Sequence, residues 1–374
     1  MIVAGRRLSG DPALAGRWCE RLAAGAAQSR LLLLLAGTDT AAVPGISAAG
    51  ATPEARRWTA AADAELLLLG PGRHRPHALP PLPAGVSPAL IARVVVEYLG
   101  LDPLVVDLGC PVAPAVPHLQ LGQRPAACLS TGAAMAAPRV RQLLALGRRW
   151  GQRLAMRPEP LLLAECVPGG TSTAQAVLQA LGVQAGGLVS GSLRDPVHGL
   201  KQQLVQRGLA AAALGPDPSA TAVLAAVGDP MQAVAAGLVF AAAQAGLPVM
   251  LAGGSQMAAV LALALALAEP GQRAVLSSRV AIATTAWVAA EAGSDLAALL
   301  RRIAARWTYE PLAFAASLRF SGCRSPELLA YEQGYVKEGV GAGGLALLWE
   351  LSGRSPGALA AACDQACDQL RIEV

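Results

Sequence analysis

The segment 161–173 (LLLAECVPGGTST) combines residue types that could hold and act on a phosphorylated ligand. Its apolar start predicts a buried strand that ends at the carboxylate of Glu165. A glycine turn and three hydroxyl residues then begin a predicted helix that runs to Leu181. The residues of this turn are Gly169, Gly170, Thr171, Ser172 and Thr173.

This turn has two interpretations. In the first it is an anion site that fits phosphate, because glycines let the backbone approach a ligand and the N–H groups at a helix start lie at the positive end of its dipole. In the second, Thr171 or Ser172 caps the helix in an ordinary strand-to-helix turn. Glu165 favours a ligand site, because open α/β sheets bind ligands at the carboxyl ends of their strands.

Short apolar runs alternate with helical segments along most of the chain. The predicted strands are 31–35, 66–69, 104–108, 161–165, 222–227, 248–251 and, as the last main strand, 280–285. This alternation predicts an α/β fold with a mostly parallel, Rossmann-like sheet and helices on both faces. We expect a nucleotide-binding domain over residues 30–300 and a smaller, mainly helical domain formed by residues 1–29 and 301–374.

Two other predicted strands, 222–227 and 248–251, also end in polar glycine turns. The carboxyl ends of parallel strands meet at one edge of a sheet, so these turns should lie beside the turn that follows Glu165 and form a ligand crevice with it. The residues of the two turns are Gly228, Asp229, Gly253, Gly254 and Ser255.

A second carboxylate, Glu338, precedes a run of glycines near the end of the chain. Gly339, Gly341 and Gly344 match G-x-G-x-x-G, but no apolar strand precedes them and too few residues follow for a dinucleotide-binding unit. The glycines would let a ligand lie against Glu338. Alternatively, Glu338 is an acid in the first turn of the predicted helix 345–351, where the helix dipole stabilises it.

The composition limits the classes of partner. The net charge is +5, but arginines are scattered and aromatic residues make up only 3%, so we expect no nucleic-acid partner. Polar residues and glycines interrupt the most apolar stretch, 231–268, so we expect no membrane span. The seven cysteines lack metal-site spacing, and no apolar run follows the first arginines. We therefore predict no metal, no signal peptide and a cytoplasmic protein with free thiols.

Taken in order, several of these motifs resemble the nicotinate-nucleotide-dimethylbenzimidazole phosphoribosyltransferase family, which acts in the assembly of the cobalamin lower ligand. The resemblance covers residues 87–344 and is nearest to a branch found in archaea and cyanobacteria. The motifs are Glu165 with its glycine turn, Gly228-Asp229-Pro230, the segment 248–256, and Glu338-Gly339-Val340-Gly341-Ala342.

The resemblance implies a homodimeric enzyme that moves the phosphoribosyl group of nicotinate mononucleotide to a base, without a cofactor. By this likeness Glu338 would be the general base, Glu165 the second active-site carboxylate, and the turn 169–173 the phosphate site. Lys201 matches a family lysine by order, or is a surface cation of its helix. The polar turns after strands 222–227 and 248–251, and the glycines after Glu338, would complete the substrate site.

The chain also departs from the family pattern. Ser87 fits the serine of the family's benzimidazole pocket approximately, but no glutamine matches its partner. The loop 37–51 has no counterpart in the better-known bacterial enzymes and could line the acceptor site. The acceptor is therefore open between adenine, a benzimidazole and another base. Two further functions stay open, a nucleotide-binding protein without activity and a hydrolase that transfers ribose to water.

Overall fold

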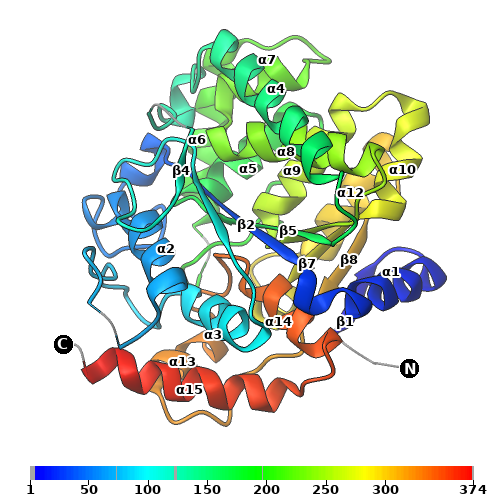
Figure 1. Ribbon diagram of the computed structural model, residues 1–374. Coiled ribbons are helices and arrows are strands. Elements are labelled where there is room, and N and C mark those ends of the chain that lie inside the picture. Colours follow the sequence, from blue (N-terminus) through cyan, green and yellow to red (C-terminus); the bar gives the residue numbers. More distant parts are fainter. Residues whose placement is uncertain (1–4, 73, 122–123, 196, 373–374) are drawn as a thin grey trace.

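The computed structural model describes residues 5–372, except 73, 122–123 and 196. Its centre is an eight-stranded sheet in the order β1-β8-β7-β6-β5-β2-β3-β4 (Figure 1). β1 is antiparallel to β8, and all other neighbours are parallel. The strands are β1 (Arg6–Ser9), β2 (Arg30–Leu35), β3 (Leu104–Asp107), β4 (Leu119–Gln120), β5 (Leu161–Cys166), β6 (Val249–Ala252), β7 (Val280–Thr284) and β8 (Leu312–Ala315). The predicted α/β fold with a mostly parallel sheet is confirmed.

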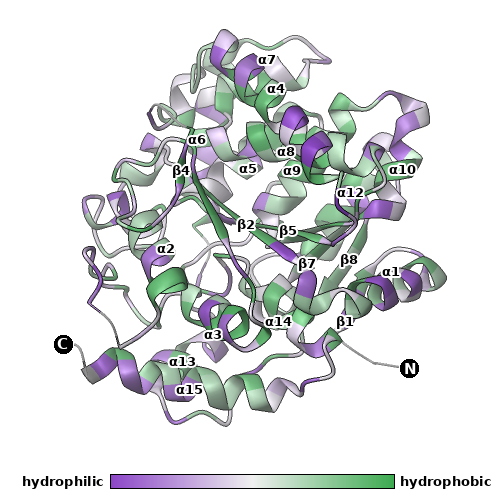
Figure 2. Ribbon diagram, in the orientation of Figure 1, coloured by the Kyte–Doolittle hydropathy of each residue, from purple (hydrophilic) through white to green (hydrophobic). Residues whose placement is uncertain are grey.

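Helices cover both faces of the sheet because its strands carry apolar side chains on both sides. Along β2, Leu32 and Leu34 belong to one core, whereas Leu31, Leu33 and Leu35 belong to the other. Figure 2 shows the same arrangement, with hydrophobic strands in the middle and hydrophilic residues along the outer helices. Within the described residues, no helix has both the length and the apolar character needed to cross a membrane.

The two cores are built from different parts of the chain. The first core takes side chains from α4 (Ala137–Leu154), α5 (Gly170–Ala180), α6 (His198–Ala212), α7 (Ala220–Val227), α8 (Pro230–Gln244), α9 (Ser255–Leu267), α10 (Arg273–Arg279) and α12 (Leu296–Trp307). The second takes them from α1 (Pro12–Ala24), α2 (Thr59–Leu69), α3 (Ala89–Leu99), α13 (Pro326–Glu332), α14 (Ala342–Leu351) and α15 (Pro356–Ile372). The short helix α11 (Ala286–Ala289) contributes to both.

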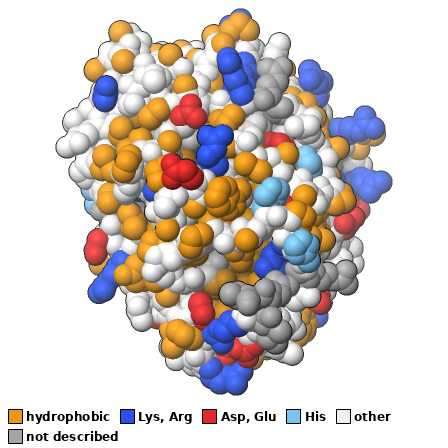
Figure 3. All heavy atoms as spheres, turned by 90° about the vertical axis from the view of Figure 1, so that its left-hand side faces the viewer, with side chains coloured by type: hydrophobic (Ala, Val, Ile, Leu, Met, Phe, Trp, Pro, Cys, Tyr) orange, Lys and Arg blue, Asp and Glu red, His pale blue; other side chains and the backbone are white. Residues whose placement is uncertain are grey.

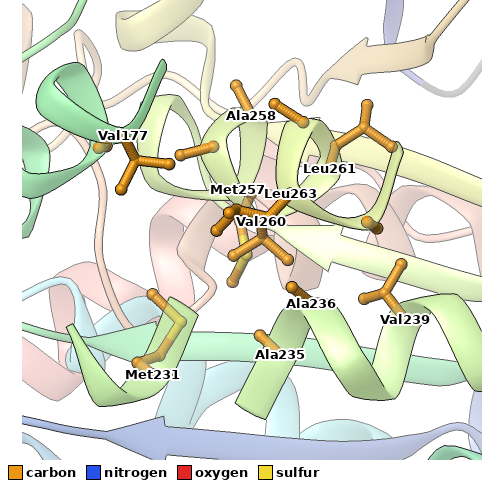
Figure 4. Packing of buried hydrophobic residues seen from close by; sticks show 14 of the residues in the cluster. Val177, Met231, Ala235, Ala236, Val239, Met257, Ala258, Val260, Leu261 and Leu263 are labelled. Carbon is orange, nitrogen blue, oxygen red and sulfur yellow. The ribbon is translucent and has the colours of Figure 1, made fainter. Parts of the chain in front are cut away.

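Small side chains bring the helices of the first core close together. A methyl group added at Gly147 of α4 would collide with the carbonyl of Val234 in α8, and one at Gly237 would collide with that of Leu144. Figure 4 shows how alanines, valines and methionines of α8 and α9 fill the space between these helices. The core therefore packs closely with very few aromatic rings.

Two predicted strands are helical in the structure. Residues 66–69 are the last turn of α2, and residues 222–227 lie in α7, where the side chain of Ser219 caps the helix by accepting from Ala222 N. Both predictions were wrong because a short, fully buried apolar run has no periodicity that distinguishes a strand from a helix. Only two of the three predicted polar turns after strands therefore follow strands, those after β5 and β6.

The terminal segments contribute two strands that were not predicted. β1 pairs with β8, and β8 pairs with β7, so residues 1–29 and 301–374 extend the sheet of the central part. Each strand has only four residues, too few for a clear pattern. The sheet continues across the predicted domain boundary at residue 300, and the division into two domains stays a prediction.

Candidate functional site

A cavity of about 310 Å³ lies at the carboxyl edge of the sheet and is lined by both Glu165 and Glu338. Glu165 stands near the end of β5, and Glu338 lies in the turn that precedes α14. The N–H of Val340 donates to the carbonyl of Glu165 at 2.9 Å, which ties the two segments together. The two acids, far apart in the chain, share one cavity.

Two walls with different chemistry enclose this cavity. The glycine wall consists of residues 169–171, 190–192 and 254–256, and is mostly backbone with a few hydroxyls. The α2–α3 wall consists of Thr59, Asp63, and residues 79–82 and 85–88, and is mostly proline and aliphatic side chains around one acid. The turn that carries Glu338 lies against the α2–α3 wall, because Gly339 packs on Pro88.

Glu165 lies among other acids. Its pKa is raised to about 8, first by burial and then by the negative charges of Asp229 and Glu338. Because side chains alternate along a strand, Glu165 is on the same face of β5 as Leu161 and Leu163, towards α8. Both causes disfavour the charged form of Glu165, and a cation beside it would favour ionisation.

Glu338 is held by four hydrogen-bond donors. Its Oε2 accepts from Thr284 Oγ1 at 2.9 Å and from Thr285 N at 3.0 Å, and its Oε1 accepts from Gly339 N at 3.2 Å and Gly343 N at 3.0 Å. Burial raises the pKa of this carboxyl, and the four donors act against that rise. Gly343 is in the first turn of α14, so Glu338 does interact with the start of this helix, as predicted. Glu338 itself lies before the helix and not in its first turn.

The backbone around Glu338 is strained. Val336, Lys337 and Val340 have φ angles of 63°, 66° and 52°, a region that residues with a Cβ rarely adopt and that costs on the order of 1–3 kcal/mol each. Lys337 anchors the turn, because its Nζ contacts Glu291 Oε1 at 2.9 Å and donates to the carbonyls of Leu193 and Gly334. Strain of this kind is typical of functional sites.

Two helices start at the glycine wall without a side-chain cap. α5 has Gly169 as its N-cap, at φ 80°, and α9 has Gly254, and neither start shows a side-chain hydrogen bond. The interpretation in which Thr171 or Ser172 caps α5 was therefore wrong. At the start of α5, Gly170 N donates to the carbonyl of Val167 at 2.9 Å and Ser172 N donates to that of Gly169 at 3.0 Å, so Thr171 N is the amide left for a ligand. The first-turn amides of α9 have no acceptor among the described residues, and an anion is the ligand that such a start favours.

Gln256 adds a side-chain donor to the glycine wall. It is buried, and its Oε1 accepts from Gln232 Nε2 at 3.1 Å, whereas its Nε2 has no hydrogen-bond partner among the described residues. A methyl group at Gly170 would collide with this Nε2. Gly170 is needed here because the amide of Gln256 passes directly over it.

The charged side chains that line the cavity in the described residues are acidic. Within the described part of the chain, its lining includes Asp63, Glu165 and Glu338 but no lysine, arginine or histidine. Lys201, predicted as a substrate ligand, lies behind the glycine wall, where its Nζ donates to the carbonyl of Ser190 at 2.7 Å. Its pKa is lowered to about 8, mainly by burial. Described His, Cys, Asp and Glu side chains form no group of three or more that could hold a metal.

Not all predicted residues reach the cavity. Gly169, Gly170, Thr171, Gly254, Ser255, Ser87 and Gly339 line it, together with the two glutamates. Asp229 instead caps α8 and accepts from Thr173 Oγ1 at 2.6 Å, and burial raises its pKa to about 6. This pair supports the glycine wall from behind. The other predicted residues outside the lining are Ser172, Gly228, Gly253, Gly341 and Lys201.

Several lining residues were not predicted. Asp63 lies on α2 and accepts from Ser87 Oγ at 2.5 Å. No motif surrounds Asp63. An acidic residue within an alanine-rich segment was the only feature of the sequence that could have indicated a site residue there. The loop 37–51, which the sequence suggested as a lining of the acceptor site, reaches the cavity through residues 47–49, and Ala48 N donates to Ser192 Oγ at 2.8 Å. The other lining residues missed include Thr59, Cys166, Ser190, Ser192 and Gln256.

A parallel sheet with uncapped helix starts and buried acids at its carboxyl edge is typical of α/β proteins that bind phosphorylated ligands. A family model described as phosphoribosyltransferase matches residues 89–292, more than half of the chain. The chain belongs to this phosphoribosyltransferase family.

Relatives and solved structures agree with this assignment. The chain is 53% identical over 363 residues to a UPF0284 protein from Prochlorococcus marinus (strain MIT 9313), covering 95% of this chain and 89% of the relative. It is 48% identical over 363 residues to a UPF0284 protein from Gloeobacter violaceus, covering 97% and 93%. These relatives are cyanobacterial. The predicted resemblance to a branch that also occurs in archaea was therefore wrong in its archaeal part.

Two solved structures from Thermus thermophilus share the fold. CobT aligns with a TM-score of 0.59 and 20% identity, covering 96% of this chain and 93% of that one. A nicotinate-nucleotide-dimethylbenzimidazole phosphoribosyltransferase aligns with a TM-score of 0.55 and 18% identity, covering 96% and 92%. At these identities the likeness establishes the fold, and not the substrate.

Proposed function

We propose that this protein transfers the phosphoribosyl group of nicotinate mononucleotide to a heterocyclic base, in the formation of the lower-ligand nucleotide of cobamides. The observation that carries this proposal is that Glu165 and Glu338 line one cavity together with two uncapped helix starts. A solved structure with the same fold, the nicotinate-nucleotide-dimethylbenzimidazole phosphoribosyltransferase of Thermus thermophilus, suggests the reaction class.

In this proposal the glycine wall holds the phosphate. The donors that support it are the amide of Thr171 at the start of α5, the first-turn amides of α9 and the unpartnered Nε2 of Gln256. Because the described lining has no cationic side chain, backbone N–H groups and helix dipoles would carry most of the attraction. Fixing the phosphate positions the ribose for attack and lowers the entropy cost of the reaction.

The bond from ribose C1′ to the nicotinate nitrogen breaks, and its electron pair stays on the nicotinate ring. Positive charge grows at C1′ as it does so. Glu165 ionises when the positively charged ring of the nucleotide binds beside it, and its carboxylate then stabilises the charge at C1′. Nicotinate leaves as a stable aromatic acid, and the proposal includes no cofactor.

The base supplies the new bond to C1′ from a ring nitrogen lone pair. Glu338 takes the proton that the base loses, as a general base. Its longest hydrogen bond, from Gly339 N at 3.2 Å, is the one that this proton would replace most easily. We also propose a cytoplasmic homodimer that takes small-molecule substrates.

The test is to incubate the purified protein with nicotinate mononucleotide and, separately, adenine, benzimidazole and dimethylbenzimidazole, and to identify the products by mass spectrometry. The expected result is free nicotinate and the base that carries the phosphoribosyl group, in equal amounts. Free ribose 5-phosphate would indicate a hydrolase instead. Unchanged nucleotide that nevertheless binds would indicate a nucleotide-binding protein without activity.

A further inference from the structure

We propose that Asp63 selects the acceptor, by accepting a hydrogen bond from an N–H group that the base carries in addition to its reacting ring nitrogen. This inference rests on the proposed function and names the class of base that the α2–α3 wall would take. That class is a planar fused azole with an amino substituent.

The hydrogen bonds of Asp63 leave part of its carboxylate free. Oδ1 accepts from Ser87 Oγ at 2.5 Å, and Oδ2 accepts only from the thiol of Cys166 at 3.2 Å. A thiol is a weak donor, and a carboxylate offers about four acceptor positions. Asp63 is only 4% exposed and lines the cavity, so the cavity is where a further donor can reach it.

Several other buried acids of this protein accept hydrogen bonds from backbone N–H groups. Glu338 accepts from three of them, and Glu350 accepts from Gly5 N and Ser317 N. Asp229 accepts from Gln232 N and from the hydroxyl of Thr173. None of the hydrogen bonds found for Asp63 among the described residues comes from the backbone. Burial accordingly raises its pKa to about 6.

Asp63 and Glu338 line the same cavity, and the segment before Glu338 lies against the wall that carries Asp63. Tyr331 Oη donates to the carbonyl of Val86 at 2.8 Å, which fixes the segment before Glu338 against the α2–α3 wall. Gly85 packs on Val336 in the same way. A base whose ring nitrogen reaches Glu338 would therefore lie along this wall, with Asp63 available to a second polar group.

The rest of the wall favours a flat, uncharged ring. Leu79, Pro80, Pro81, Leu82 and Val86 contribute apolar surface to the cavity. An anionic acceptor along this wall would lie near the carboxyl groups of Asp63 and Glu338, and the described lining offers no cationic side chain to offset the repulsion, which disfavours it. An amino group meets an acceptor in Asp63, whereas a methyl group at that place would leave the buried carboxylate without a donor.

The experiment compares matched pairs of bases, adenine with purine and an aminobenzimidazole with benzimidazole, as acceptors from nicotinate mononucleotide. For wild type we expect kcat/KM to favour the amino base of a pair by roughly 10–100-fold, the range of a hydrogen bond to a charged group. Asp63→Asn keeps the shape but presents an NH₂ group, so we expect this preference to fall below about threefold. The expected loss lies in KM for the amino base, while kcat/KM for purine and the affinity for the nucleotide stay within about threefold.

Two controls make the outcome specific. Asp102→Asn, at an exposed acid, should keep the wild-type preference. Asp63→Ser, which keeps an oxygen acceptor but no charge, should show an intermediate preference, and it serves also if the asparagine variant does not fold. Equal affinity of wild type for amino and unsubstituted bases overturns the inference, and so does an equal loss with both bases in Asp63→Asn. If wild type transfers to no base at all, the proposed function fails, and the inference fails with it.

Discussion

The glycine wall and the α2–α3 wall of the cavity differ in origin. The glycine wall includes the turns that follow β5 and β6, and the sheet topology alone brings these turns to one edge. The α2–α3 wall comes from a helix and a proline-rich loop that follow no strand directly. Under the proposed function, the comparison teaches that the sheet topology would supply the site for the nucleotide, and that the α2–α3 wall would decide which acceptor the nucleotide meets.

Helix capping also differs between helix starts that line the cavity and one that does not. α8 begins with a complete capping box between Asp229 and Gln232, and its start does not line the cavity. α5 and α9 begin without side-chain caps, and their starts do line it. A side chain thus satisfies a donor at the start of α8, whereas no side chain does so at the starts of α5 and α9, which face the cavity.

The positive net charge of the chain does not form a basic patch on the face shown in Figure 3. On the face shown in Figure 3, lysine and arginine side chains are scattered among hydrophobic and uncharged ones and do not gather into one basic patch. The net charge of +5 is therefore spread over the molecule, at least on this face.

The largest effect should come from Glu338→Gln, which removes the proton acceptor beside the α2–α3 wall. We expect kcat to fall by about 10²–10⁴-fold, the usual contribution of a general base. The dissociation constant for nicotinate mononucleotide, measured by calorimetry, should change less than about threefold, because the glycine wall is untouched. Exposed Glu310→Gln is the control and should behave as wild type. Full activity in Glu338→Gln would end the general-base role.

The pH dependence should show the second acid. With its pKa raised to about 8, Glu165 is protonated and neutral in the free protein below that pH. Under the proposed function only the ionised form stabilises the positive charge at C1′, so kcat/KM for the nucleotide should rise with pH through a midpoint near 8 and then level off. Glu165→Gln should lower the plateau by roughly 100-fold and remove the rise. A variant profile that still rises through pH 8 would assign the ionisation to another group.

A smaller effect should distinguish the contribution of the phosphate to binding from that of the rest of the nucleotide. Gln256→Leu removes the free Nε2 donor of the glycine wall, and we expect the affinity for nicotinate mononucleotide to fall by roughly tenfold, as for a hydrogen bond to a charged group. The affinity for the nucleoside without phosphate should not change. Gln333→Leu, at an exposed glutamine, is the control. Equal losses for nucleotide and nucleoside would place Gln256 away from the phosphate.

The smallest effect concerns stability. Gly169→Ala places a Cβ at φ 80° and about 3.0 Å from Ala41 N, so we expect the free energy of unfolding to fall by about 1–2 kcal/mol. Gly199→Ala, in α6 with open space around it, should be neutral or stabilising by up to about 1 kcal/mol. Urea unfolding of the two variants measures both changes. A Gly169→Ala variant as stable as wild type would show that the turn tolerates a side chain.

The sequence predicted the glycine wall better than the α2–α3 wall. A strand, a glycine turn and a helix follow one another around Glu165, and this local order is sufficient to place the acid at the sheet edge. Asp63 has no such context, because its helix was predicted to lead into a strand at 66–69, and a buried apolar run does not distinguish the two. Lys201 was placed by order alone, which cannot tell that its amine lies behind Ser190.

The strained turn at 336–341 has a consequence for redesign. Glu338 keeps its position through backbone angles, through the buried pair of Lys337 and Glu291, and through contacts with residues 85–88 of the α2–α3 wall rather than with residues 79–82. Residues 79–82 could thus be exchanged for those of a relative while the acid remains in register. Under the proposed function, such chimeras would accept new bases at little loss of turnover, whereas changes at Lys337 would slow every base alike.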